Sequence, residues 1–310
     1  MAANTIVLIT GANTGLGLET VRSLLQSPGK TYTILLGGRS LEKATTAAKQ
    51  VKDEFPQSQS VVTPVQIDVE DDQSINALFE NLEQHHGRLD VLINNAGEAS
   101  VPIIRAAPLV SSSSHQSSIK GLTLTLMLSC ASTGGQLEPK MSSGELTMRQ
   151  MWNKSWDVNV TGTYILTYTL IPLLLKSSDP RLLFITSGTA TLTESTNPAV
   201  IVNQSPGEKG WPKTNRGLTG LGIPAYRASK TGMNMMMREW VRVLKDDNVK
   251  VWCVSPGFLA TGLGFGNPER LKQLGALDPS VGAGVVRDVV DGLRDQDVGS
   301  VVRKDGVQPW

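Results

Sequence analysis

Two side chains that could transfer a proton, Tyr226 and Lys230, lie four residues apart at the start of an expected helix. Four residues are about one helical turn, so both side chains project from the same face. A free tyrosine, with a pKa of about 10, holds its proton too tightly for reversible transfer at neutral pH. A nearby lysine ammonium stabilises the phenolate and lowers that pKa. The same spacing is common where a tyrosine packs and a lysine is solvated, so the pair alone does not assign chemistry.

A glycine-rich loop near the N-terminus follows an expected strand and leads into an expected helix. Gly11 allows a sharp turn, Gly15 allows backbone to approach a pyrophosphate, and Gly17 allows the helix to pack close to the strand. The helix N-terminus adds unpaired N–H groups and a partial positive charge. Glycines also mark ordinary turns, but the strand–loop–helix context favours a dinucleotide site. Its expected cofactor-binding residues are Gly11, Asn13, Thr14, Gly15, Leu16 and Gly17.

The spacing Gly-x-x-x-Gly-x-Gly resembles that of the short-chain dehydrogenase/reductase family, and further motifs come in the family's order. They are Asp68-Val69, Asn94-Asn95-Ala96-Gly97, Asn159 within Asp157–Gly162, Ser187, Tyr226-Arg-Ala-Ser-Lys230, and Pro256-Gly257 with Thr261. The resemblance covers essentially the whole chain except two irregular stretches.

The resemblance implies a catalytic role for four of these residues. Tyr226 is then the general acid, and Lys230 lowers its pKa and bonds the nicotinamide ribose. Ser187 orients a substrate carbonyl, and Asn159 holds a water that connects Lys230 to solvent. Thr186 and Thr189 remain alternative hydroxyls to Ser187.

The resemblance also implies further cofactor contacts, some of them shared with the catalytic pair. Asp68 and Val69 are expected beside the adenine, and Thr261 beside the nicotinamide amide. The remaining expected contacts are Asn95, Ala96, Gly97, Tyr226, Lys230, Pro256 and Gly257.

The end of the second expected strand, Gly37-Gly38-Arg39-Ser40, favours NADP(H) over NAD(H). NAD-specific enzymes place an acidic side chain there to bond the ribose hydroxyls. Here a glycine takes that place, and Arg39 and Ser40 can bond a 2′-phosphate. Two points remain open: Arg39 could simply extend into solvent from a strand end, and Thr14 replaces a basic residue found in many NADP-dependent members.

Short apolar runs alternate with helical patterns along the chain, which is typical of βαβ units and a parallel sheet. Strands are expected at 5–10, 31–36, 61–67, 89–94, 181–186, 249–254 and 299–303. Helices are expected at 16–25, 41–55, 72–85, 151–175 and 225–244. We predict one α/β domain over 1–310, a Rossmann-type, doubly wound parallel sheet flanked by helices.

Two stretches, about 98–143 and 189–222, lack this alternation of strand and helix patterns and are expected to be irregular insertions. The second resembles an insertion before the catalytic tyrosine in the carbonyl-reductase branch, where it covers an oligomerisation face. A monomer is therefore expected, with a homo-oligomer as the alternative. Deleting roughly 98–134 joins Asn94-Asn95-Ala96-Gly97 to the stretch around Gln136 at an ordinary family length. We therefore interpret 98–134 as a retained intron or a gene-model error.

Composition excludes several classes of partner and compartment. With 29 basic and 28 acidic residues, the chain has no excess positive charge for nucleic acid. Its two cysteines form neither a disulfide framework nor a metal cluster, which indicates a reducing compartment. A signal peptide and a membrane span are not expected, because the first strand begins at once and no apolar run is long enough. We expect a cytoplasmic protein without a metal.

These features together predict reduction of a ketone or aldehyde by NADPH, with a small-molecule substrate of unknown identity. One alternative is NAD(P)-dependent oxidation of a secondary alcohol by the same residues. The other is an NADP(H)-sensing regulator that retains the fold without the chemistry.

Overall fold

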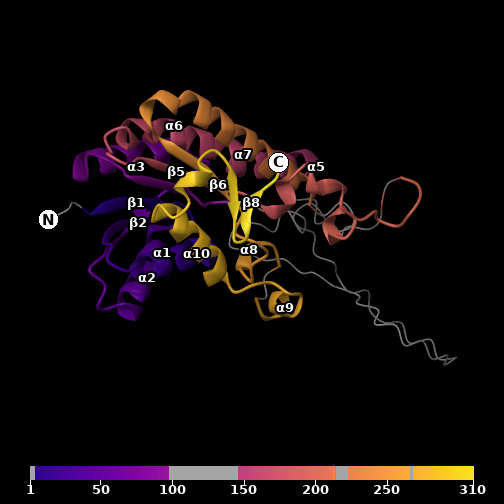
Figure 1. Cartoon of the computed structure of the whole chain (residues 1–310), viewed down its shortest axis with the longest axis horizontal. Helices are drawn as coiled ribbons and strands as arrows, with labels where there is room; N and C mark the ends of the chain where they lie inside the picture. The colour runs from indigo at the N-terminus through magenta and orange to yellow at the C-terminus, as the bar shows by residue number, and fades with distance from the viewer. Residues whose placement is uncertain (1–3, 98–145, 212, 214–222, 266–267) are drawn as a thin grey trace.

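The computed structural model describes residues 4–97, 146–211, 213, 223–265 and 268–310. One eight-stranded sheet, ordered β3-β2-β1-β4-β5-β6-β7-β8, runs through this part of the chain (Figure 1). Neighbouring strands are parallel except β7 and β8. The strands are β1 (Thr5–Ile9), β2 (Tyr32–Gly38), β3 (Val61–Gln66), β4 (Val91–Asn94), β5 (Arg181–Ile185), β6 (Lys250–Val254), β7 (Val301–Arg303) and β8 (Gly306–Gln308).

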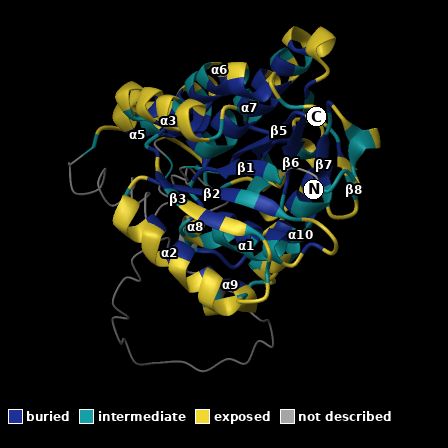
Figure 2. Ribbon diagram, turned by 90° about the vertical axis from the view of Figure 1, so that its left-hand side faces the viewer, coloured by how far each residue is buried: buried dark blue, intermediate teal, exposed yellow. Residues whose placement is uncertain are grey.

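Helices cover both faces of the sheet, so the described part has three layers (Figure 2). One apolar core lies under α1, α2 and α10, and the other under α3, α6 and α7. The helices are α1 (Gly15–Leu25), α2 (Leu41–Glu54), α3 (Asp72–His85), α5 (Met148–Trp156), α6 (Thr163–Leu174), α7 (Pro224–Val243), α8 (Gly262–Phe265), α9 (Pro268–Gln273) and α10 (Pro279–Val290).

Strand β1 shows why the sheet needs both layers of helices. Ile6 and Leu8 belong to one core, while Val7 and Ile9 belong to the other. Successive side chains of a strand point to opposite faces, so an all-apolar strand must be covered on both sides. The predicted α/β, doubly wound parallel sheet is confirmed.

The carboxyl ends of the four central strands meet at one edge of the sheet. The glycine loop follows β1, Asn95 follows β4, Ser187 follows β5 and Pro256 follows β6. In open α/β sheets, ligands bind outside this edge. The topology therefore gathers segments that are far apart in the sequence.

The expected single helix over 151–175 is divided by a π-helical turn, Asp157–Gly162, between α5 and α6. The helix also starts earlier than expected, because Thr147 and Gln150 form a capping box. The reason for the turn is close packing: a Cβ on Gly162 would lie 2.0 Å from the carbonyl oxygen of Val69. A widened turn lets this glycine face the chain after β3.

The C-terminal part contains elements that the sequence pattern did not predict. Helix α10 was missed because its valines and glycines do not stand out as a helical pattern. Its start was nevertheless encoded, since Asp278 caps the helix and Pro279 occupies the first turn. The antiparallel strand β8 and the short helices α8 and α9 were also missed.

Of the two irregular stretches, 98–143 lies outside the described residues, as does the proposed intron 98–134. The expected loop 189–222 is described as far as 211 and at 213. It is more ordered than a plain loop, with short 3₁₀ turns at Gly188–Ala190, Glu194–Thr196 and Ile201–Asn203. Across the described ranges, every helix is too short or too polar to cross a membrane.

Candidate active site

The glycine loop after β1 has the backbone geometry that its glycines predict. Gly11 and Gly15 have φ of +62° and +56°, a region that other residues adopt only with strain. Asn95 braces the loop, because its Nδ2 donates to the carbonyl oxygens of Thr10 at 2.8 Å and Gly11 at 3.1 Å. Ala96 adds a bond from its N–H to the Thr10 hydroxyl at 2.9 Å. The end of β4 thus fixes the shape of the loop.

The N-terminus of α1 has no side-chain cap and no acidic residue in its first turn. Thr14 is the residue at the capping position. Leu16 and Gly17 lie in that turn, and their N–H groups point along the helix axis. Thr261 lies opposite, with its Cβ 3.7 Å from a Cβ built on Gly15. The sequence motifs after β1 and β6 therefore face each other.

The end of β2 is closed by the glycine loop. The Oδ1 atom of Asn13 is 3.1 Å from a Cβ built on Gly38, so a larger residue there would press on the loop. Arg39 is exposed and makes interactions of its own. Ser40 caps α2 by accepting from the Lys43 N–H at 3.3 Å. Arg39 and Ser40 thus lie at the carboxyl edge, near Asn13.

The turn after β3 carries the residues expected beside the adenine. The Asp68 N–H donates to the Ser74 hydroxyl at 2.9 Å, and Asp68 Oδ1 accepts from the Glu70 N–H at 3.1 Å. Val69 is buried. These bonds fix the turn next to the π-helical segment that packs on Val69.

Lys230 is a buried ammonium group on α7. Its side chain is 3% exposed, and Nζ donates to the carbonyl oxygen of Ile185 at 2.8 Å. Burial lowers the pKa of Lys230 to about 8, against a small opposing effect of the Cys253 thiol. The group is therefore positioned at the end of β5 and can release or take a proton near neutral pH.

Tyr226 lies one helical turn before Lys230 on α7. Burial raises the pKa of Tyr226, and the Ser187 hydroxyl acts in the opposite direction. Of the two alternative hydroxyls, Thr186 bonds Asn234 at 2.7 Å. Thr189 bonds the Ser187 hydroxyl itself at 3.0 Å. Ser187 is thus the hydroxyl that acts on the pKa of the tyrosine.

Asn159 reaches the same place from the π-helical turn. It is fully buried, and its Nδ2 donates to the Ser229 hydroxyl at 2.9 Å. A Cβ built on Gly97 would lie 3.3 Å from Asn159 Oδ1 and 3.4 Å from Lys230 Nζ. Gly97 therefore borders both side chains, and the structure brings Asn159, Lys230, Tyr226 and Ser187 together.

Two residues of this region, Ser229 and Gln308, were not singled out from the sequence. Ser229 accepts from Asn159 and donates to the Tyr226 carbonyl oxygen at 2.9 Å. Gln308, on β8, donates from Nε2 to the carbonyl oxygen of Ser187 at 3.3 Å. Only Ser229 had a sequence signal, because it lies three residues from Tyr226 on the same helix.

A family model described as short chain dehydrogenase matches residues 5–113 and 216–270. A Phoma sp. protein named short-chain dehydrogenase/reductase eupG is 39% identical over 318 residues, covering 98% of this chain and 97% of its own. This chain belongs to the short-chain dehydrogenase/reductase family. The family relative tropE of Talaromyces stipitatus is 37% identical over 305 residues, again covering 98% of this chain and 97% of its own.

Solved structures share the fold of this short-chain dehydrogenase/reductase. An NADPH-bound carbonyl reductase from chicken fatty liver aligns with a TM-score of 0.66 at 19% identity, covering 99% of this chain and 100% of that one. L-Sorbose reductase of Gluconobacter frateurii, complexed with NADPH and L-sorbose, aligns with a TM-score of 0.64 at 17% identity, covering 99% and 97%. At these identities the likeness concerns the fold.

Membership of this family makes the protein an oxidoreductase that uses a nicotinamide dinucleotide. The residues present fit such a cofactor. The backbone of the glycine loop has the required positive φ at Gly11 and Gly15, and the α1 N-terminus is uncapped by a side chain. Gly97 leaves open the space beside Asn159 and Lys230 that a side chain would fill.

Proposed function

We propose that the protein is an NADPH-dependent reductase that converts a ketone or aldehyde to an alcohol. The observation that carries the proposal is the buried ammonium of Lys230 at the end of β5, one helical turn from Tyr226, where Gly97 borders both Lys230 and Asn159. These groups lie at the sheet edge that also holds the glycine loop. A carbonyl reduction needs a proton donor at the oxygen and a hydride at the carbon, and this edge supports both.

The proton-transfer part is assigned to residues of this chain. Tyr226 donates its phenolic proton to the oxygen that develops negative charge, and Ser187 donates a hydrogen bond to the same oxygen. The positive charge of Lys230 stabilises the resulting phenolate. Asn159 holds the polar path by which the tyrosine is reprotonated, with Ser229 as its neighbour.

The cofactor is assigned to the glycine loop and the turns after β2, β3, β4 and β6. When bound, the reduced nicotinamide supplies the hydride. The α1 N-terminus would hold the pyrophosphate, Asp68 and Val69 the adenine, and Thr261 the nicotinamide amide. Arg39 and Ser40 would bond a 2′-phosphate, and the close approach of Asn13 to Gly38 disfavours the acidic side chain typical of NAD-specific sites.

The test is turnover of NADPH against a panel of ketones, aldehydes and quinones, followed by the Tyr226→Phe variant on the best substrate. General acid–base catalysis contributes about 10²- to 10⁴-fold, so we expect kcat to fall by that order while NADPH binding is retained. If Tyr226→Phe kept full activity, the assigned mechanism would be wrong. NADPH binding without turnover of any carbonyl or alcohol would instead support a nucleotide-sensing regulator.

A further inference from the structure

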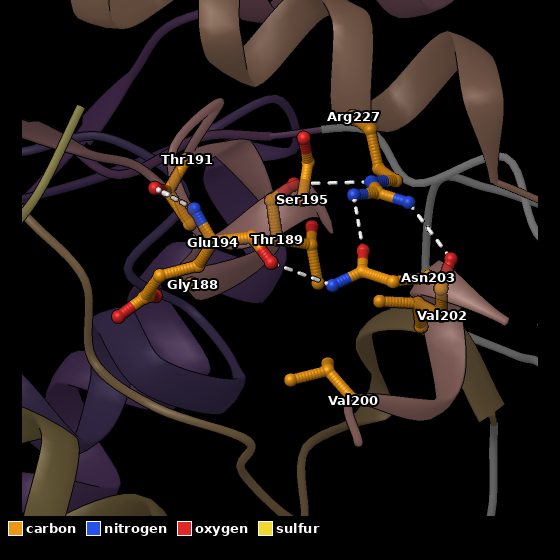
Figure 3. Close-up of a pocket in the computed structure, with 9 residues that line it drawn as sticks. All are labelled: Gly188, Thr189, Thr191, Glu194, Ser195, Val200, Val202, Asn203 and Arg227. Carbon is orange, nitrogen blue, oxygen red and sulfur yellow. Dashed lines mark hydrogen bonds between the residues drawn. The ribbon is translucent and has the colours of Figure 1, made fainter. Parts of the chain in front are cut away.

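Arg227 follows Tyr226 on α7 and holds the loop that carries Ser187 (Figure 3). Its guanidinium makes three hydrogen bonds to that loop. Nε donates to the carbonyl oxygen of Thr189 at 3.1 Å, and Nη1 donates to that of Val202 at 2.8 Å. Nη2 donates to Asn203 Oδ1 at 2.7 Å. One side chain thus joins both ends of the segment 189–203 to the catalytic helix.

These three acceptors are neutral, which is an unusual use of a half-buried positive charge. Burial lowers the pKa of Arg227, and the dipoles of these three oxygens, rather than a carboxylate, stabilise its charge. The carboxylate near this segment, Glu194, pairs with Arg303 at 3.1 Å. A planar guanidinium with several donors in fixed geometry is suited to holding carbonyl oxygens in place. Arg227 therefore holds these oxygens through the fixed geometry of its donors and does not neutralise a negative charge.

The cavity bordered by Arg227 and this segment is too small to be a substrate site. Its volume of about 30 Å³ suits ordered water. A second contact of α7 supports the same segment, since the Thr231 hydroxyl donates to the carbonyl oxygen of Ala190 at 3.0 Å. Arg227 and Thr231, one helical turn apart, bind consecutive parts of the loop.

The Arg227 contact leads directly back to Tyr226. Arg227 holds the Thr189 carbonyl oxygen, and the Thr189 N–H donates to Ser187 Oγ at 3.1 Å. The Ser187 hydroxyl in turn lowers the pKa of Tyr226, the chain neighbour of Arg227. Two hydrogen bonds and one peptide bond thus connect Ser187 to Tyr226 through Thr189 and Arg227. Loosening either hydrogen bond changes where Ser187 lies relative to Tyr226.

We propose that Arg227 is a positioning residue that fixes Ser187 against Tyr226 by holding Thr189. The inference rests on the proposed function of Tyr226 and Ser187. Without the guanidinium of Arg227, the 189–203 segment can move relative to α7. The hydroxyls of Ser187 and Tyr226 then no longer reach the same substrate oxygen. A misplacement of about 1 Å can cost on the order of 10²-fold in rate.

Steady-state kinetics on the best carbonyl substrate test this with Arg227→Met, Arg227→Lys and a control. Arg227→Met removes the guanidinium and keeps an aliphatic side chain. We expect kcat to fall by about 10- to 100-fold. KM for NADPH should stay within about twofold, because the cofactor residues are untouched. Arg227→Lys should retain more of kcat than Arg227→Met, since lysine keeps hydrogen-bond donors but lacks the planar guanidinium. The control is Arg242→Met, an exposed arginine on the same helix bonded to Glu239.

A second measurement does not depend on turnover. Titration of ¹³C-tyrosine-labelled protein by NMR gives the pKa of Tyr226, whose signal is assigned by its loss in Tyr226→Phe. The Ser187 hydroxyl lowers the pKa of Tyr226, so its displacement should raise that pKa. Because loss of the arginine charge also raises it in Arg227→Met, the deciding variant is Arg227→Lys, which keeps the charge and loses the planar guanidinium. The other titratable groups around this corner, Lys230, Cys253 and the paired Glu194, are unchanged in the variant.

The outcomes separate the two proposals. A lower kcat in Arg227→Met, and a Tyr226 pKa that is raised in the charge-conserving Arg227→Lys as well, neither seen in Arg242→Met, support positioning. Unchanged kcat and unchanged Tyr226 pKa in a folded Arg227→Met protein overturn it. If wild-type protein turns over no carbonyl, the proposed function fails, and the Tyr226 titration still decides whether Arg227 positions Ser187.

Discussion

At the scale of single residues, the site depends on burying groups that water would otherwise stabilise. Lys230 is almost fully buried with its charge directed at one carbonyl oxygen, and Tyr226 is partly buried with Ser187 as its partner. Burial disfavours the charged form of each group, so the pKa of the lysine falls and that of the tyrosine rises. Such placement lowers stability and is typical of groups that do chemistry.

This cost predicts how stability depends on pH. The pKa of Lys230 falls from 10.5 in the unfolded chain to about 8 in the native protein. Between those values the unfolded chain binds more protons, so the native protein gains stability as pH rises, by on the order of 3 kcal/mol. Relative to Lys230→Met, the wild-type apoprotein should therefore become more stable from pH 8 to 10.5 in urea unfolding. If the difference in unfolding free energy between wild type and Lys230→Met did not vary with pH, the Lys230 ammonium would not be desolvated in the native protein.

We propose that the cofactor preference also depends on a single exposed residue, Arg39. Replacing Arg39 by Gln removes a charge-assisted bond to a 2′-phosphate, worth about 1.5–3 kcal/mol. We expect KM for NADPH to rise by roughly 10- to 100-fold, with KM for NADH nearly unchanged. Lys49→Gln is the matched control, because Lys49 is an exposed base on the adjacent helix α2. Equal changes in KM for NADPH and for NADH would mean that Arg39 does not bind the 2′-phosphate.

At the scale of elements, the π-helical turn between α5 and α6 connects packing to chemistry. It places Asn159 inward beside Ser229, and it brings Gly162 onto the Val69 carbonyl oxygen. Val69 follows the expected adenine contact Asp68. A single irregular turn therefore connects the segment proposed for catalysis with the segment proposed to hold the adenine.

Gly162→Ala tests this packing. A Cβ only 2.0 Å from a backbone oxygen forces the turn or the 68–69 segment to move, since backbone cannot yield as a side chain can. Overpacking usually costs about 1–3 kcal/mol, and here we expect the upper end, together with weaker NADPH binding. Chemical unfolding and cofactor titration measure the two effects.

Gly284→Ala on α10 is the matched control, because a Cβ built there meets nothing within 4 Å. Alanine is the better helix former by up to about 1 kcal/mol, so this variant should be as stable as wild type or more stable. Equal behaviour of the two variants would mean that the close approach at Gly162 does not determine the shape of the turn.

At the scale of the whole molecule, the C-terminal strands complete the loop that carries Ser187. Gln308 donates to the Ser187 carbonyl oxygen, and the Trp310 carbonyl oxygen accepts from the Thr191 hydroxyl at 3.1 Å and the Thr193 N–H at 2.6 Å. The hairpin of β7 and β8 thus holds a segment more than a hundred residues away in sequence. The C-terminal end of the chain therefore supports the candidate active site directly.

The segment 98–134 is the other feature that belongs to this scale. If it is a retained intron, a chain lacking it joins β4 to the helix that carries Asn159 by an ordinary connection. We then expect the shortened protein to reduce carbonyls at least as fast as the full chain and to unfold in one sharper transition. Activity assays and calorimetry compare the two proteins. Transcript sequencing decides the origin: a spliced message that still encodes the segment contradicts the hypothesis.

The sequence alone determined the sheet, its central strands and the residues at their ends. Apolar strands with turn glycines are local signals, and in a parallel sheet the residues just after each strand all emerge at the same edge. The Gly11–Gly17 loop and Ser187, each directly after a strand, could therefore be assigned to one edge, and the family resemblance added Tyr226 and Lys230. Helix α10 could not be predicted, because a valine-rich run is compatible with a helix or a strand. Strand β8 could not be predicted either, because three residues are too few to show a periodic pattern.

Only the tertiary structure decided which groups touch. Three findings depend on contacts between distant segments: Ser187 rather than Thr186 acts on the pKa of Tyr226, Asn159 lies in a π-helical turn, and Arg227 holds Thr189. The physical reason is burial: Lys230 acquires its lowered pKa from the elements packed around it. The sequence encodes a tyrosine and a lysine four residues apart, and the fold supplies the surroundings in which that pair can act.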